Sequence, residues 1–176
     1  MTHVMTDAMA DNPCLYVGTY EKYNNGSIAG AWVDLTQFKD KDEFYDFIKK
    51  LHNDEHDPEF MFQDSQNFPS FLYSESGLDE RIFDWLALPD EEREYIAAYW
   101  DEIGADDIDY IQDAFYGCYK DFDEFVYDSV DNSFSHIFKD YPTMETYFDY
   151  EAYGRDLTYD YNTADAKSGV FIYRKH

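Results

Sequence analysis

Residues 14–35 read CLYVGTYEKYNNGSIAGAWVDL, in which two segments of β-forming residues flank a turn. The segments Cys14–Tyr20 and Ala29–Leu35 are short and rich in residues that fit a pleated strand, among them Val, Tyr, Thr and Trp. Asn24-Asn25-Gly26 lies between them and supplies residues that tolerate positive φ angles. The stretch therefore predicts two antiparallel strands joined by a turn.

A helix is predicted after this strand pair. Apolar side chains recur at helical spacing from about Asp42 onward, at Phe44, Phe47, Ile48 and Leu51. Residues 59–73 then predict a strand and a loop, with Pro69 as the break. We expect residues 14–73 to form an N-terminal domain of an antiparallel sheet and a helix, preceded by a flexible extension over residues 1–13.

The next segment, residues 74–112, is predicted to be a central acidic helical domain. Ser76-Gly77-Leu78-Asp79 has the pattern of a capping box that opens one helix. Pro89 and the acids that follow it favour the start of a second helix, which we expect to end at Gly104. Residues 106–119 predict a third helix, because apolar side chains recur along one side.

Residues 113–176 are predicted to form a C-terminal α+β domain. The fold class is therefore α+β, and we expect an elongated chain of three small units. The elements predicted for the last unit are a helix over 121–131, a helix from Thr143, a break at Gly154-Arg155-Asp156, a loop over 160–168 and a closing strand over 169–173.

The charge balance excludes several classes of protein. The chain has 39 acidic and 13 basic residues and a formal net charge of −26. Disordered acidic tails are poor in aromatic residues, whereas 20% of this chain is aromatic. Binding to nucleic acid needs clustered Lys and Arg, so a net charge of −26 excludes nucleic acid as a direct partner.

The sequence also predicts a location. No run of 18 apolar residues occurs, so no membrane helix is predicted. The first 13 residues are polar and lack the pattern of a signal peptide, which favours the cytoplasm.

Cys14 and Cys118 are far apart in sequence and belong to no C-x-x-C pair, so neither a disulfide framework nor a zinc site is expected.

Acidic side chains recur on one face of each predicted helix in the middle of the chain. Helical residues three or four positions apart lie about 5–6 Å from one another, a spacing of the same order as that of successive phosphates. Residues 74–112 contain only Arg81 and Arg93 to pair with these acids. We predict a partner-binding surface that imitates DNA phosphates, formed by Asp90, Glu91, Glu94, Asp101, Glu102, Asp106, Asp109, Asp113, Asp121, Glu124, Asp128 and Asp131.

The acidity is also compatible with two hypotheses that involve no mimicry. The first hypothesis is that each acidic row is simply the solvated face of an ordinary amphipathic helix. An acid-adapted structural protein or protein-interaction module would be acidic too, although the 33 Phe and Tyr residues exceed what such a surface needs. Charge density permits DNA mimicry, because 26 charges correspond to roughly 44 Å of duplex DNA.

No catalytic or cofactor motif is present. His52 and His56 are four residues apart, but Asn53 stands where a zinc protease needs Glu, and a hydrated helix end is the expected structure. No acidic cluster has the glycine of a calcium loop, and phosphate-binding glycine loops are absent. We therefore expect no catalytic residue, no metal site and no cofactor, and a protein that is not an enzyme.

Two blocks of the sequence resemble the ArdA antirestriction proteins. The first block is LYVGTYEKYNNG at 15–26, continuing through Gly30-Ala31-Trp32, and the second is YFDYEAYGRDL at 147–157. Weaker similarity lies between them, including Leu88-Pro89-Asp90-Glu91-Glu92. The residues at 64–69 depart from the family pattern, as do the N-terminal extension and the Asp-rich segment near 159–165.

The resemblance implies a non-enzymatic inhibitor carried by mobile genetic elements. Such a protein imitates bent duplex DNA and occupies the DNA groove of type I restriction-modification enzymes, which their DNA-specificity and methyltransferase subunits form. It implies an elongated homodimer of three-domain subunits. It also implies that Gly154 and Arg155 are architectural, as a helix end and an internal ion-pair partner.

The aromatic content of the C-terminal unit points to a homodimer as well. So small a unit is expected to be unable to bury all of its aromatic side chains by itself. We therefore predict a dimer interface among Tyr141, Tyr147, Phe148, Tyr150, Tyr153, Phe171 and Tyr173.

Overall fold

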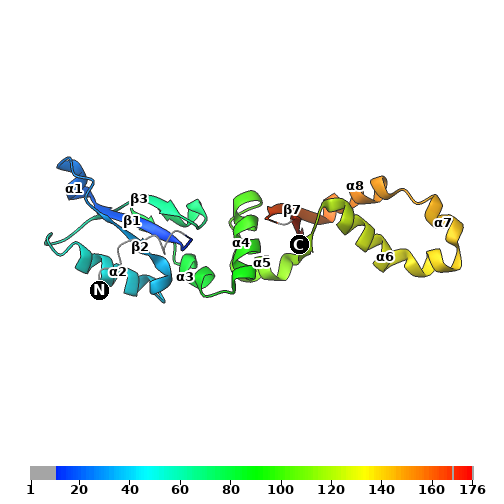
Figure 1. The fold of residues 1–176 in the computed structure, drawn as a ribbon, viewed down its shortest axis with the longest axis horizontal. Coiled ribbons are helices and arrows are strands. Elements are labelled where there is room, and N and C mark those ends of the chain that lie inside the picture. The colour runs from blue at the N-terminus through cyan, green and yellow to red at the C-terminus, as the bar shows by residue number, and fades with distance from the viewer. Residues whose placement is uncertain (1–10, 168, 176) are drawn as a thin grey trace. The chain divides into compact units, whose positions relative to one another are not determined.

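A computed structural model of the chain describes residues 11–167 and 169–175 (Figure 1). It divides into two compact units, unit 1 up to Pro89 and unit 2 from Asp90 onward. Both units combine helices with antiparallel strands, which confirms the α+β class. The predicted partition into three units, with boundaries at residues 73 and 112, stays a prediction, and the expected flexibility of residues 1–10 lies outside the described residues.

The sheet of unit 1 is built around the first predicted strand. Strand β1 (Cys14–Thr19) lies between β2 (Ala31–Asp34) and β3 (Phe60–Gln66), and both neighbours are antiparallel to it. The connection from β1 to β2 contains the short helix α1 (Tyr20–Asn24) and then Gly26, whose φ of 79° is the positive angle expected of the turn. The predicted strand pair and the third strand are confirmed.

Helix α2 (Lys41–Leu51) confirms the helix predicted from about residue 42. The Asp40 side chain caps it by accepting a hydrogen bond from the backbone N–H of Glu43 at 2.9 Å. Phe44 is fully buried, and its ring lies 6.0 Å from that of Phe62 in β3. The helix is thereby held against the sheet by aromatic contact.

The remainder of unit 1 departs from prediction at one helix start. Two 3₁₀ turns, η2 (Leu35–Gln37) and η3 (Ser70–Leu72), and a short hairpin of β4 (Tyr73–Ser74) and β5 (Gly77–Leu78) precede α3 (Arg81–Leu86). The predicted capping box at 76–79 is therefore wrong, because half of it pairs as a strand. Asp79 instead accepts a hydrogen bond from the Arg81 N–H at 3.0 Å.

Unit 2 packs helices onto a second antiparallel sheet. Its strands β6 (Phe115–Tyr119), β8 (Gly169–Arg174) and β7 (Tyr161–Ala166) lie in that order, with β8 in the centre. Helix α4 (Asp90–Glu102) begins at the predicted acids, and α5 (Ile108–Ala114) leads into β6. Tyr95 of α4 stacks on Phe115 at 3.9 Å between ring centroids, which anchors the helix to the sheet.

Two predictions for unit 2 are wrong because strand pairing overrides the local pattern. The helix predicted for 106–119 ends at Ala114, since Phe115–Tyr119 pair with β8. The loop predicted for 160–168 is largely strand β7, whose polar sequence lacks apolar alternation because it is an edge strand bonded only to β8.

The helices after β6 form a hairpin that the sequence predicted only in part. Helix α6 (Phe122–Asp140) is longer than the predicted 121–131, and α7 (Pro142–Thr146) follows it. Helix α8 (Tyr150–Asp160) returns beside α6 toward the sheet (Figure 1). The predicted break at 154–156 is wrong, because α8 continues through Gly154.

Gly154 is explained by the close approach of α8 to α6. A Cβ added at Gly154 would lie 3.0 Å from Cγ2 of Val126, closer than side chains normally come. Val126 belongs to the buried cluster of Phe125, Val126, Leu157 and Ile172, which joins both helices to β8. The glycine therefore costs helix propensity but permits tight packing of the core.

We expect Gly154→Val to lower the free energy of unfolding of unit 2 by about 1–3 kcal/mol, because its methyl groups overpack the contact with Val126. Urea unfolding followed by circular dichroism measures the change. Asp156→Val, at an exposed position of the same helix, is the matched control for inserting a β-branched residue. In the Val126→Ala background the effect of Gly154→Val is expected to shrink; equal losses in both backgrounds would contradict a packing origin.

Candidate functional site

All twelve acids predicted to form the partner-binding surface lie in unit 2. Ten of them are exposed, and Glu94 and Asp128 are half-buried. Unit 2 contains 22 acidic and seven basic residues, a net charge of −15, against −11 for unit 1. The structure thus brings the predicted acids into the more negative of the two units.

The row on α6 has the helical geometry that the sequence predicts. Glu124, Asp128 and Asp131 are helical residues, and Asp121 is the N-cap. Phe125, Val126 and Val130 are the buried residues of the same helix, so the apolar face is directed into unit 2. Asp121, Glu124 and Asp131 are therefore exposed away from this face, and the half-buried Asp128 lies at its edge, within hydrogen-bond distance of Tyr119.

Asp121 and Glu124 also cap the start of α6. The Asp121 carboxylate accepts a hydrogen bond from the Glu124 N–H at 2.9 Å, and the Glu124 carboxylate accepts one from the Lys120 N–H at 2.7 Å. The first of these bonds lowers the pKa of Asp121, because it stabilises the charged form. The reciprocal contacts fix both carboxylates at the positive end of the helix dipole.

The predicted row at residues 106, 109 and 113 is only partly helical. Asp109 and Asp113 are exposed on α5, but Asp106 precedes the helix. One carboxylate oxygen of Asp106 accepts a hydrogen bond from the Tyr99 hydroxyl at 2.8 Å. Its backbone carbonyl accepts one from the Trp100 indole N–H, also at 2.8 Å. Asp106 is therefore fixed to α4 and not to α5.

The acids of α4 have differing surroundings. Asp90 pairs with Arg93, and Glu102 accepts a hydrogen bond from the Asp165 N–H at 2.9 Å. Partial burial of its carboxyl raises the pKa of Asp101. Glu91 is exposed at the start of the helix, where a negative charge is favoured by the dipole.

Several exposed acids of unit 2 were not predicted as part of the surface. Helix α8 carries Glu151, Asp156 and Asp160; Asp156 lies in the break expected at 154–156, and Asp160 lies in the loop expected over 160–168. Arg155, expected to be an internal ion-pair partner, is exposed and lies 3.9 Å from Glu151 one turn away. That prediction is wrong, since a residue on the outer face of a continuous helix reaches only solvent-exposed partners.

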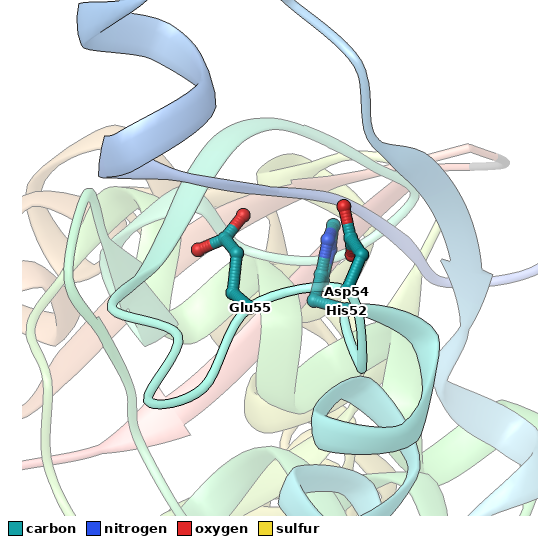
Figure 2. A group of neighbouring side chains, drawn as sticks. All are labelled: His52, Asp54 and Glu55. Carbon is teal, nitrogen blue, oxygen red and sulfur yellow. The ribbon is translucent and has the colours of Figure 1, made fainter.

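Among residues 11–167 and 169–175, His52, Asp54 and Glu55 of unit 1 form a cluster with the spacing of a metal site (Figure 2). One potential ligand atom from each side chain lies within 4.8 Å of the others. The Lys22 ammonium lies among them, 2.9 Å from Nδ1 of His52, 3.0 Å from Asp54 and 3.3 Å from Glu55. Three acceptors thus surround a group with three N–H donors, so Lys22 supplies the cation of the cluster.

The helix end expected at His52 is confirmed, because His52 is the C-cap of α2, but its expected hydration is wrong. The side chain is only 3% exposed, because β1 and α1 cover it, and Nε2 lies 3.3 Å from the Val17 carbonyl. The Thr19 hydroxyl donates to Glu55 at 2.6 Å from the same segment. His56, the second histidine of the sequence pattern, is exposed and lies outside the cluster.

The neighbours of His52 and Lys22 shift the pKa values of both side chains. Burial, and then the charge of Lys22, lowers the pKa of His52. Burial opposes the charge on Lys22, but hydrogen bonds to Asp54 and Glu55 outweigh it and raise the pKa of the ammonium. The hydrogen bond from Lys22 lowers the pKa of Asp54. A neutral imidazole beside an ammonium and two carboxylates is therefore the stable arrangement.

We expect unit 1 to lose stability as the pH falls below about 6.5, the usual pKa of histidine. The unfolded chain then binds a proton at His52 that the folded cluster resists, so the free energy of unfolding decreases with falling pH. The slope for one such group is at most about 1.4 kcal/mol per pH unit. Urea unfolding at pH 7.5 and 5.5 measures the difference.

His52→Gln is expected to reduce this loss between pH 7.5 and 5.5, because the variant has no imidazole to protonate. His56→Gln, at an exposed position of unit 1 outside the cluster, is the matched control and should leave the loss unchanged. An identical pH dependence in the wild type and in His52→Gln would show that the cluster does not resist protonation.

Within the described ranges 11–167 and 169–175, no helix is long and apolar enough to cross a membrane.

Comparison with known proteins identifies the family of the chain. No curated protein sequence matches it. Residues 15–172 match the family model described as "Antirestriction protein (ArdA)", which covers nearly the whole chain and spans both blocks of resemblance. The chain therefore belongs to the ArdA family of antirestriction proteins.

Proposed function

We propose that the protein inhibits type I restriction-modification enzymes by imitating duplex DNA in their DNA-binding groove. The observation that carries the proposal is the surface of unit 2, where ten of the twelve predicted acids are exposed and the net charge is −15. Membership of an antirestriction family supplies the biological context. The partner is then a protein, the DNA-specificity and methyltransferase subunits, and not nucleic acid, which a net charge of −26 repels.

The mode of action follows from electrostatics. A groove that binds DNA is lined with basic side chains, which attract any surface with a comparable density of negative charge. Occupation of that groove excludes DNA, so restriction stops without any chemical step by the inhibitor. DNA modification by the same methyltransferase core would stop for the same reason. Because these enzymes act on cellular DNA, we propose that the protein acts in the cytoplasm.

The summed field of the acids is expected to matter more than any one of them. A single exposed ion pair contributes about 0–1 kcal/mol, so one Asp→Asn change should weaken binding about fivefold at most. Joint Asp121→Asn, Glu124→Gln, Asp128→Asn and Asp131→Asn substitution should weaken it about ten- to hundredfold. Asn at residue 121 still caps α6, so the helix is retained. Competition with labelled duplex for a purified type I methyltransferase measures the affinity.

The matched control for this set is the joint neutralisation of Asp42, Asp46, Asp57 and Glu59, four exposed acids of unit 1. It removes the same charge and should have the smaller effect. Affinity should also fall as salt rises, because the Debye length shortens to about 8 Å at physiological ionic strength. Loss of all inhibition from one substitution, or affinity that does not change with salt, would favour a localised site or an acid-adapted protein without mimicry.

We also propose that the protein is a homodimer joined through the hairpin of unit 2. Phe171 and Tyr173, two of the aromatic residues predicted for the interface, are buried in the core of the unit and do not contribute. Tyr141, Met144 and Tyr147 remain at least 55% exposed. Met144 and Tyr147 belong to the lining of an apolar groove of about 530 Å³, which is formed by Phe134, Ile137, Phe138, Thr143, Met144, Tyr147 and Phe148.

Charge also favours this segment for self-association. Residues 133–148 contain Lys139, Asp140 and Glu145, a net charge of only −1 in a chain of −26. Two copies can approach through the hairpin with little repulsion, whereas the acidic rows would repel. Exposed apolar surface of this kind is typical of a protein–protein interface.

We expect wild-type protein to be a dimer at micromolar concentration and the double variant Met144→Asp, Tyr147→Asp to be a monomer, because four carboxylates would then meet in the dimer interface. Size-exclusion chromatography with light scattering measures the mass, and circular dichroism checks the fold. Tyr159→Asp, at a position of α8 that is 76% exposed, is the matched control and should stay dimeric. A monomeric wild type would refute the dimer.

A further inference from the structure

Two tyrosine hydroxyls of unit 2 hold carboxylates that belong to the predicted surface. The Tyr119 hydroxyl donates to Oδ2 of Asp128 at 3.0 Å, and the Tyr99 hydroxyl donates to Oδ2 of Asp106 at 2.8 Å. Asn132, one turn after Asp128 on α6, donates to the same oxygen at 3.0 Å. Both carboxylates are thus bonded to side chains that carry no charge.

The two tyrosines are themselves fixed by packing. Tyr99 is only 3% exposed, and its ring meets that of Tyr173 edge-on at 5.0 Å. Tyr119 lies in β6, and its ring centroid is 5.3 Å from that of Phe125, a fully buried residue of α6. Each hydroxyl therefore projects from a rigid aromatic core toward the surface, and its position is set by the fold.

Both hydroxyls keep their protons at physiological pH. Burial, and then the hydrogen bond to Asp106, raises the pKa of Tyr99, and the same two causes with Asp128 raise the pKa of Tyr119. A protonated phenol is a hydrogen-bond donor, so it orients the carboxylate. It adds no positive charge, so the carboxylate keeps its full negative charge for a partner.

Charged donors hold some carboxylates elsewhere in the chain, as examples from unit 1 show. Asp54 and Glu55 are paired with the Lys22 ammonium, and Asp79 with the Arg81 guanidinium at 2.8 Å. Those pairs fix the acids but offset part of their negative charge. Uncharged donors fix an acid and leave its charge, which is the requirement for a surface that must present negative groups at set positions.

We propose that Tyr119 and Tyr99 are positioning residues. They hold Asp128 and Asp106 at positions that correspond to phosphates of the DNA bound by the target enzyme. This inference rests on the proposed DNA mimicry and specifies how two of its charges are arranged. A carboxylate that is already ordered loses less side-chain freedom when the partner binds, so the tyrosines raise affinity through preorganisation.

The experiment compares Tyr119→Phe with the wild type in competition with labelled duplex for a purified type I methyltransferase. The change keeps the ring and every formal charge, and removes only the hydroxyl. We expect the affinity to fall about two- to tenfold, the range for one side chain that must be ordered on binding. Tyr99→Phe should act in the same direction through Asp106, and Asn132→Ala, at an exposed position, through Asp128.

Salt dependence separates positioning from charge. The slope of log Kd against log salt should be unchanged in Tyr119→Phe, because no charge is lost, and shallower in Asp128→Ala. In the Asp128→Ala background Tyr119→Phe should change affinity less than twofold, since the group it positions is gone. Tyr159→Phe, a residue 76% exposed on α8, is the control for loss of a phenol hydroxyl. Thermal unfolding of each variant identifies any loss of fold.

The outcomes are distinct. Wild-type protein that fails to displace the duplex overturns the proposed function and this inference with it. Displacement by the wild type together with unchanged affinity in folded Tyr119→Phe and Asn132→Ala overturns the inference alone. Equal losses from Tyr119→Phe in the presence and absence of the Asp128 side chain would assign the effect to the β6 core and also overturn it.

Discussion

Mutual repulsion among 22 acidic side chains, with only seven basic residues to offset them, is the constraint on which unit 2 depends. Its aromatic core provides the opposing attraction, since each buried aromatic ring removes about 150–250 Å² from water. Tyr173 illustrates this, because its ring is fully buried and its hydroxyl donates to the Tyr95 carbonyl at 2.6 Å. The buried Phe and Tyr residues of unit 2 are therefore the counterpart of its acidity and not a separate feature.

Carboxylates of the chain are held by two kinds of donor, charged and uncharged. Unit 1 places an ammonium, Lys22, among His52, Asp54 and Glu55, so part of the negative charge of the two carboxylates is offset locally. In unit 2, hydroxyl, amide and backbone donors bond Asp128, Glu92 and Glu102 and leave their negative charge in place. A carboxylate that is hydrogen-bonded but not neutralised keeps its charge for a basic partner.

Stability and the proposed function share residues at the start of α6. Asp121 and Glu124 cap the helix through backbone N–H groups, and both also belong to the acidic row. Asn and Gln retain much of the capping while removing the charge, whereas Ala would remove both. Neutral amides are therefore the substitutions that separate the role of these side chains in the fold from their role at the surface.

The sequence by itself determined the α+β class, the first strand pair, the starts of α2, α4 and α6, and the acids on the α6 face, because strand propensity, helical periodicity and capping are local properties. Tertiary structure decided that Phe115–Tyr119 and Tyr161–Ala166 are strands, since both depend on pairing with β8. It decided that α8 continues through Gly154, where Val126 fills the space of the missing side chain. It also placed Lys22 against His52, 30 residues away, a contact that no local pattern contains.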